Sequence, residues 1–145
     1  MLDVIPAHPG MALMFEAQPA QVLSGQQMTP EGLAAAIASG PAFAAVKGTK
    51  ILAIGGIADR PDWGSKGIIW GVLSVGIYAT MTPIHRAVRR ALELAPQERI
   101  EAHILADHAE GCRWIEMLGF VRETPVPMKK FWQGRDCWLY AKVKG

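Results

Sequence analysis

The sequence predicts an α/β (α+β) domain with elements in the order β–α–α–β–β–β–α–β–α–β–β. Two observations predict this class. Amphipathic helical segments with start and stop signals alternate with short apolar runs of strand length. Those runs show little alternation of apolar and polar residues, which is typical of a sheet covered on both faces. A chain of 145 residues can bury one such core, so we expect a single domain over residues 1–145.

The first third of the chain predicts one strand and two helices. Residues 2–5 form a candidate edge strand, and residues 9–17 carry apolar side chains at helical spacing. The helix over residues 29–38 is better defined, because Thr29 can cap it and Pro30 suits its first turn.

Three strands are expected next. Residues 42–47 and 50–57 are separated by Gly48-Thr49, which is the spacing of a two-residue hairpin. The third strand, residues 67–75, is reached through a polar loop.

The most amphipathic helix begins with Thr82 as its N-cap and Pro83 as its first helical residue, and it stops at Pro96. Its apolar positions recur at helical spacing and form the expected buried stripe. These positions are Ile84, Val88, Ala91, Leu92 and Ala95, and the solvent face carries Arg86, Arg89, Arg90 and Glu93.

The rest of the chain predicts a strand, a helix and a closing pair of strands. The strand covers Arg99 to Leu105, and the helix begins at Ala109. Gly119 suits the left-handed turn just past a helix end, and Phe120 then fills the space beneath the helix. The closing strands are residues 121–130 and 135–143, which turn at Gln133-Gly134.

The strand and the helix that ends in Leu118-Gly119-Phe120 resemble the last signature segment of the GNAT superfamily of N-acetyltransferases. The order of elements is similar over nearly the whole chain. The resemblance implies a GNAT-like mixed, mostly antiparallel sheet of 6–7 strands flanked by helices. It also implies an acetyl-CoA site where the sheet splays after the fourth strand, with the pyrophosphate on N–H groups that begin the next helix. The residues assigned to that site by position are Val75, Thr82, Ile84, His85 and Arg86.

Two departures from the family pattern concern the chemistry. Active members usually carry a Gln/Arg-x-x-Gly-x-Gly/Ala loop before that helix, but residues 78–85 contain no glycine pair and Pro83 lacks an N–H donor. In the pattern Asn-x-x-Ala-x-x-x-Tyr-x-x-x-Gly-Phe, the Tyr protonates the departing CoA thiolate. Here His108 holds the Asn position and Ile115 the Tyr position, and an isoleucine cannot donate a proton.

The candidate catalytic residues are His103, His108 and Tyr78. His103 and His108 lie on or just beyond the fifth strand, near Glu101, where an imidazole can act as a general base. Tyr78 or Tyr140 is an alternative proton donor. A lone histidine on a strand is more often a packed or surface residue than a catalyst, so both interpretations stay open.

Composition narrows the classes of function. The formal charge of +2 does not by itself indicate nucleic-acid binding, and we expect no specific nucleic-acid partner. No apolar run is long enough to span a bilayer. Cys112 and Cys137 form no CxxC pair and have no metal-ligand spacing with the histidines, so we expect reduced thiols and no metal site.

A narrower resemblance comes from residues 52–56, Trp70, the arginine-rich helix, Arg113-Trp114-Ile115 and the tail at 142–145. These segments look like the GNAT-like small internal virion proteins of short-tailed bacteriophages. That resemblance implies a virion or assembly role in a bacterial host cytoplasm and in the virion, with other virion proteins or further copies as partners. Trp63 and Trp132, both next to turn residues, are candidates for such a contact surface.

Two functions therefore remain. The first is a non-catalytic GNAT-fold virion or assembly component with a degenerate acetyl-CoA site and no certain cofactor. The second is an active acetyl-CoA-dependent N-acetyltransferase with an atypical phosphate-binding loop.

Overall fold

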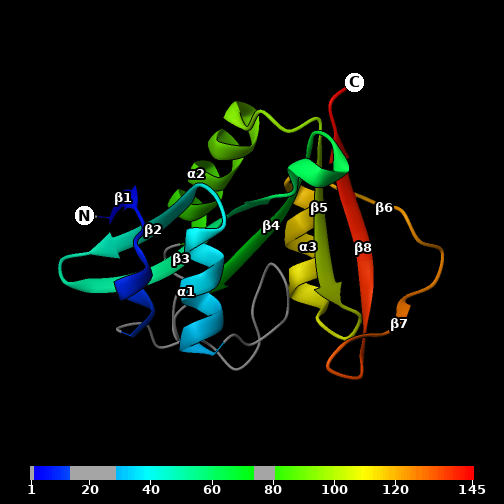
Figure 1. Ribbon diagram of the computed structural model, residues 1–145, viewed down its shortest axis with the longest axis horizontal. Helices are drawn as coiled ribbons and strands as arrows, with labels where there is room; N and C mark the ends of the chain where they lie inside the picture. The colour runs from blue at the N-terminus through cyan, green and yellow to red at the C-terminus, as the bar shows by residue number, and fades with distance from the viewer. Residues whose placement is uncertain (1, 14–28, 74–80) are drawn as a thin grey trace.

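A computed structural model of the chain describes residues 2–13, 29–73 and 81–145. Its centre is an eight-stranded sheet in the order β1-β2-β3-β4-β5-β8-β6, with β7 paired to β8 (Figure 1). The strands are β1 (Leu2–Pro6), β2 (Ala42–Lys47), β3 (Lys50–Asp59), β4 (Lys66–Leu73), β5 (Arg99–Leu105), β6 (Val121–Arg122), β7 (Met128–Trp132) and β8 (Arg135–Val143). The helices are η1 (Pro9–Leu13), α1 (Pro30–Ala38), η2 (Pro61–Trp63), α2 (Met81–Leu94) and α3 (Ala109–Met117). No helix in the described ranges is long and apolar enough to cross a membrane.

The predicted fold class is confirmed. Every strand pair of the described sheet is antiparallel except β4 and β5, which run parallel. That parallel contact is short and joins Lys66 to Arg99, Gly67 to Ile100 and Ile68 to Glu101. Figure 1 shows the two strands together at their starts and diverging toward their ends. The sheet therefore consists of two antiparallel halves that meet at one end.

Helices cover both faces of the sheet, as the apolar strand runs predict. On one face, η1 and α1 pack on a core cluster that includes Ile54, Trp70 and Val72. On the other face, α2 and α3 pack on a second cluster that includes Ile69 and Ile104. Trp70 and Val72 alternate along β4 with Ile69, so one strand supplies both cores.

Several local predictions are confirmed at residue level. The N–H of Gly32 donates to Thr29 Oγ1 at 3.0 Å and caps α1. Lys47 pairs with Lys50 across the expected two-residue turn, where Gly48 has a φ of 62°. Gln133 and Gly134 both have positive φ, as a tight hairpin turn with the right-handed twist of its strands requires.

Three predictions are corrected by the structure. α2 begins at Met81, so Thr82 is its second residue rather than its N-cap. The predicted strand over residues 121–130 is divided into β6 and β7, because Pro125 and Pro127 have no N–H group for a ladder. The sheet consequently has eight strands. Residues 9–13 form a short 3₁₀ helix, and the remainder of the predicted helix over 9–17 lies outside the described residues, as do positions 74 and 75.

The end of α3 has the geometry that its sequence predicts. Gly119 has a φ of 93°, and its N–H donates to the Glu116 carbonyl at 3.0 Å. The N–H of Phe120 donates to the Ile115 carbonyl at 3.2 Å. These two bonds satisfy carbonyls that the helix end would otherwise leave without partners, and they direct Phe120 into the core.

We predict that Gly119→Ala lowers the free energy of unfolding by about 1–2 kcal/mol, the cost of a left-handed conformation for a residue with a Cβ. The new Cβ would lie 2.7 Å from Lys142 Nζ, a flexible group that can move aside, so backbone strain should dominate. Urea unfolding measures the change. Gly119→Asn is the matched control and should lose less, because asparagine tolerates this conformation. An alanine variant as stable as the wild type would contradict the prediction.

Candidate functional site

The first turn of α2 is joined to α3 by a hydrogen bond between two ring side chains. Trp114 Nε1 donates to His85 Nδ1 at 2.7 Å. An indole nitrogen can only donate, so His85 Nδ1 carries no proton in this contact. Burial, and then repulsion from Arg89, lowers the pKa of His85. Both the geometry and the pKa therefore indicate a neutral imidazole.

The other residues predicted to meet a cofactor phosphate are spread around this turn. Thr82 and Arg86 are exposed, whereas Ile84 is buried in the core beneath the helix. Because α2 begins at Met81, His85 is its fifth residue and lies beyond the N–H groups that lack helical partners. Within the described part of this turn, Arg86 is the one predicted residue whose side chain offers a permanent positive charge.

A core side chain fills the position that carries the general acid in the GNAT pattern. Ile115 has no exposed surface and belongs to the core cluster beneath α2 and α3. The adjacent Trp114 is also buried, and its N–H is already donated to His85. No titratable group therefore stands at this point of α3.

Tyr140, considered as a substitute acid, is held in a structural network. Its hydroxyl donates to the Glu116 carboxylate at 2.7 Å and accepts from Arg122 Nη2 at 2.9 Å. Burial, and then the bond to Glu116, raises the pKa of this hydroxyl. The phenol thus links β8 to α3 and β6.

A charged network lies on the face of β5 that points away from α3. Side chains alternate along a strand, and Ala102 and Ile104 pack on the face of α3, so Glu101 and His103 face the other way. Glu101 accepts from Arg99 Nε at 2.8 Å and from Lys66 Nζ at 3.2 Å, and its Oε1 lies 3.5 Å from His103 Nε2. Sequence reasoning found Glu101 and His103 but missed Lys66, because its contact depends on the parallel register between β4 and β5.

The charges of this network follow from burial and pairing. Burial alone would raise the pKa of Glu101, but Arg99 and Lys66 outweigh it and the pKa is lowered. Burial is also the largest influence on His103 and lowers its pKa despite the nearby Glu101 carboxylate. At neutral pH the site therefore holds an ionised carboxylate beside a neutral imidazole, which can accept a proton.

The remaining predicted site residues do not join this group. His108 is the N-cap residue of α3, but its side chain makes no capping hydrogen bond. Tyr78 and Val75 lie outside the described residues. Across the described ranges, no three side chains of His, Cys, Asp or Glu gather as a metal site requires, and both cysteines are buried and reduced.

Comparison with known proteins relates this arrangement to one fold. No family model matches the sequence, and no curated protein matches it. Solved structures do match over almost the full chain. The ribosomal-protein-S5-alanine acetyltransferase from Vibrio fischeri is 17% identical, with a TM-score of 0.73 over 98% of this chain and 92% of its own.

Two further structures give the same result. An N-acetyltransferase from Staphylococcus aureus Mu50 is 11% identical, with a TM-score of 0.74 over 99% of this chain and 97% of its own. An acetyltransferase of the GNAT family from Streptococcus pneumoniae is 15% identical, with a TM-score of 0.70 over 100% of both chains. Identities this low establish the fold and nothing about activity. The chain therefore has the fold of the GNAT N-acetyltransferases.

Proposed function

We propose that this chain is a non-catalytic GNAT-fold protein that acts through protein–protein contacts, as a virion or assembly component of the phage kind that its sequence resembles. The observation that carries the proposal is Ile115. At the position that the resemblance assigns to the proton donor stands an aliphatic side chain with no exposed surface. A hydrocarbon can neither donate nor accept a proton, so acid catalysis from this helix position is excluded.

The contact between His85 and Trp114 supports the same proposal. It ties the first turn of α2 directly to α3, at the turn where the resemblance places the pyrophosphate. His85 is neutral there and offers a phosphate no positive charge. Of the predicted cofactor residues described in this turn, Arg86 alone offers a phosphate a charged side chain.

An exposed tryptophan supports a role in protein contacts. Trp63, in η2, is 66% exposed, and Lys66 Nζ lies 3.9 Å from the centre of its ring. Large aromatic side chains at the surface are typical anchors of protein interfaces. Trp132, the other predicted contact residue, is half-buried in β7 and presents less surface.

The alternative function, an active N-acetyltransferase, is favoured by His103. Its neutral imidazole lies beside Glu101, at the point where β4 and β5 stop pairing. In that function His103 would take the proton from an incoming amine, and Glu101 would stabilise the resulting imidazolium. Transfer would then depend on positioning and on this base, without an acid at Ile115.

Calorimetric titration with acetyl-CoA separates the two functions. We predict no heat of binding at ligand concentrations up to the millimolar range, because residues 78–85 contain no glycine pair, His85 is neutral and Arg86 alone cannot hold the phosphates. Micromolar binding would contradict the non-catalytic proposal. In that event His103→Gln should abolish acetyl transfer to amines while leaving acetyl-CoA binding intact.

The neutral state of His103 makes a second prediction. Its pKa is lower in the folded chain than the ordinary value of 6.5, so the unfolded chain binds the proton more tightly. Stability should therefore be complete above about pH 6.5 and should fall as the pH is lowered toward the folded-state pKa. Urea unfolding at a series of pH values measures this slope.

His103→Gln should reduce that slope between pH 6.5 and the folded-state pKa of His103, because the variant lacks this imidazole, and the lowered pKa of His85 accounts for the slope that remains. His8→Gln, at an exposed position of the chain, is the matched control for the loss of an imidazole. An unchanged slope in His103→Gln would show that the pH dependence has another origin.

A further inference from the structure

The two edges of the described sheet differ in how they are protected. At one edge, β6 has only two residues, and Pro125 and Pro127 follow it. β7 continues this edge irregularly, since its pairing with β8 shifts between Met128 and Trp132, and Lys130 has a φ of 50°. Short, irregular and proline-bearing edges hinder pairing with strands of other chains. This edge is therefore closed to further strands.

The other edge is β1, a regular strand of five residues (Figure 1). It pairs with β2 in one unbroken antiparallel register. Among residues 2–13, 29–73 and 81–145, no strand pairs with its outer side. Its side chains are also accessible, because Val4 is 46% exposed and Ile5 is 37% exposed. The strand thus presents an open and mostly apolar edge, which is the kind that pairs with another chain.

The backbone groups of β1 alternate between β2 and the open side. The N–H of Ala7 donates to the Ala42 carbonyl at 2.9 Å, one step beyond the last residue pair of the ladder. Bonded and unbonded pairs alternate in an antiparallel ladder, so Asp3 and Ile5 are also bonded to β2. The residues between them direct their backbone groups outward. These residues are Leu2, Val4 and Pro6, of which Pro6 has a carbonyl but no N–H.

These outward groups fit a second copy of the same strand. When two copies pair antiparallel about Val4, the two Val4 residues exchange both of their N–H and carbonyl bonds. On either side, the N–H of Leu2 meets the carbonyl of Pro6 from the other copy. The absent N–H of Pro6 therefore removes only one bond at each end of the pair. A shift by two residues in either direction would use only two of the three outward positions, so the register about Val4 is the best one.

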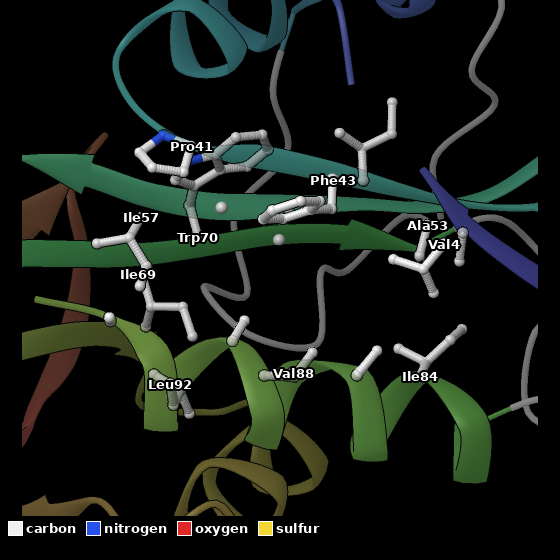
Figure 2. Close-up of a pocket in the computed structure, with 18 of the residues that line it drawn as sticks. Val4, Pro41, Phe43, Ala53, Ile57, Ile69, Trp70, Ile84, Val88 and Leu92 are labelled. Atoms are coloured by element: carbon white, nitrogen blue, oxygen red, sulfur yellow. The ribbon is translucent and has the colours of Figure 1, made fainter. Parts of the chain in front are cut away.

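The side chains of β1 favour the same register. Leu2 packs against the core cluster under α2, and Figure 2 shows Val4 at the Ile84 end of an apolar cavity of about 280 Å³ beneath that helix. Leu2 and Val4 therefore share the α2 face, where Val4 of one copy would lie beside Val4 of the other. Asp3 faces the other side and would lie opposite Ile5 rather than a second Asp3. The register thus joins apolar side chains and avoids a pair of like charges.

We infer that β1 is a self-association site, through which two copies of the chain form a two-fold symmetric dimer with one continuous sheet. The contact is isologous, because each copy offers the same strand. A pair of five-residue strands is small beside the roughly 1,200–2,000 Å² of a stable interface, so we expect a dissociation constant of roughly 10–100 μM. The inference names one contact surface for the proposed interaction role but does not depend on it. Acetyl-CoA titration tests that role, whereas the oligomeric state tests this surface.

Sedimentation equilibrium of the full chain measures the dimer. The mass should rise from the monomer value of 15.7 kDa toward twice that value as the concentration increases from about 1 to about 500 μM. Val4→Pro removes an N–H that makes no bond to β2, so it should weaken dimerisation at least about tenfold and leave a folded monomer. Val4→Lys should act likewise, because it places two ammonium groups side by side. Val126→Lys, at a valine that is 63% exposed near the other edge, is the matched control and should dimerise like the wild type.

Cysteine crosslinking tests the register. Two paired Val4 residues would have Cα atoms about 5.5 Å apart, within reach of a disulfide, whereas two Ile5 residues would lie diagonally and too far apart. On oxidation, Val4→Cys should therefore give a covalent dimer and Ile5→Cys should not, and both native cysteines are buried. A wild-type chain that stays monomeric up to about 500 μM would overturn the inference. So would a dimer that both Val4→Pro and Val4→Lys leave intact, and crosslinking of Ile5→Cys in preference to Val4→Cys would overturn the register.

Discussion

The short parallel contact between β4 and β5 is the constraint on which the rest of this structure depends. Only three residue pairs join the two antiparallel halves of the described sheet, and polar contacts gather at that end. Lys66 binds Glu101 across the junction, and Ser65 accepts N–H groups from Glu98 and Arg99 at 2.9 and 3.1 Å. A buried carboxylate is stable only when it is paired. Glu101 therefore needs Lys66 and Arg99 close by, and its bonds to them in turn hold β4 and β5 together at this end. Beyond it the strands diverge, and each half must be covered by its own helix.

The two helices on the shared face meet this requirement differently. α3 lies over a filled core, in which Ile104, Ile115 and Tyr140 have no exposed surface. α2 lies over a row of small residues and leaves a cavity beneath it. The hydrogen bond from Trp114 to His85 joins α3 to α2. Ile115 fills the core beneath α3 at the position where the GNAT pattern has its proton donor. The packing of the fold is therefore kept at this position although the acid is absent.

Local signals explain how much of this could be predicted from the sequence. The turns at Gly48 and Gly134, the cap at Thr29 and the end of α3 at Gly119 depend on residues within a few positions of one another, and all are confirmed. The division of the predicted strand over residues 121–130 also had a local signal, in Pro125 and Pro127, which the prediction did not use. Other contacts join residues far apart in the chain. They are Lys66 with Glu101, Trp114 with His85, and Gly55 with Gly71. Such contacts depend on register and helix placement, which no local pattern specifies.

A cavity of this size is expected to lower the free energy of unfolding. Cavities left by truncated core residues destabilise proteins by about 24 cal/mol per Å³, which for about 280 Å³ gives an upper limit of about 7 kcal/mol. That is comparable with the whole unfolding free energy of a domain, about 5–15 kcal/mol. The open mouth reduces this cost, because water or ligand can enter. Gly55, Gly71, Ala87 and Ala91 are among the residues that line this space, and a larger side chain at either alanine would reduce it.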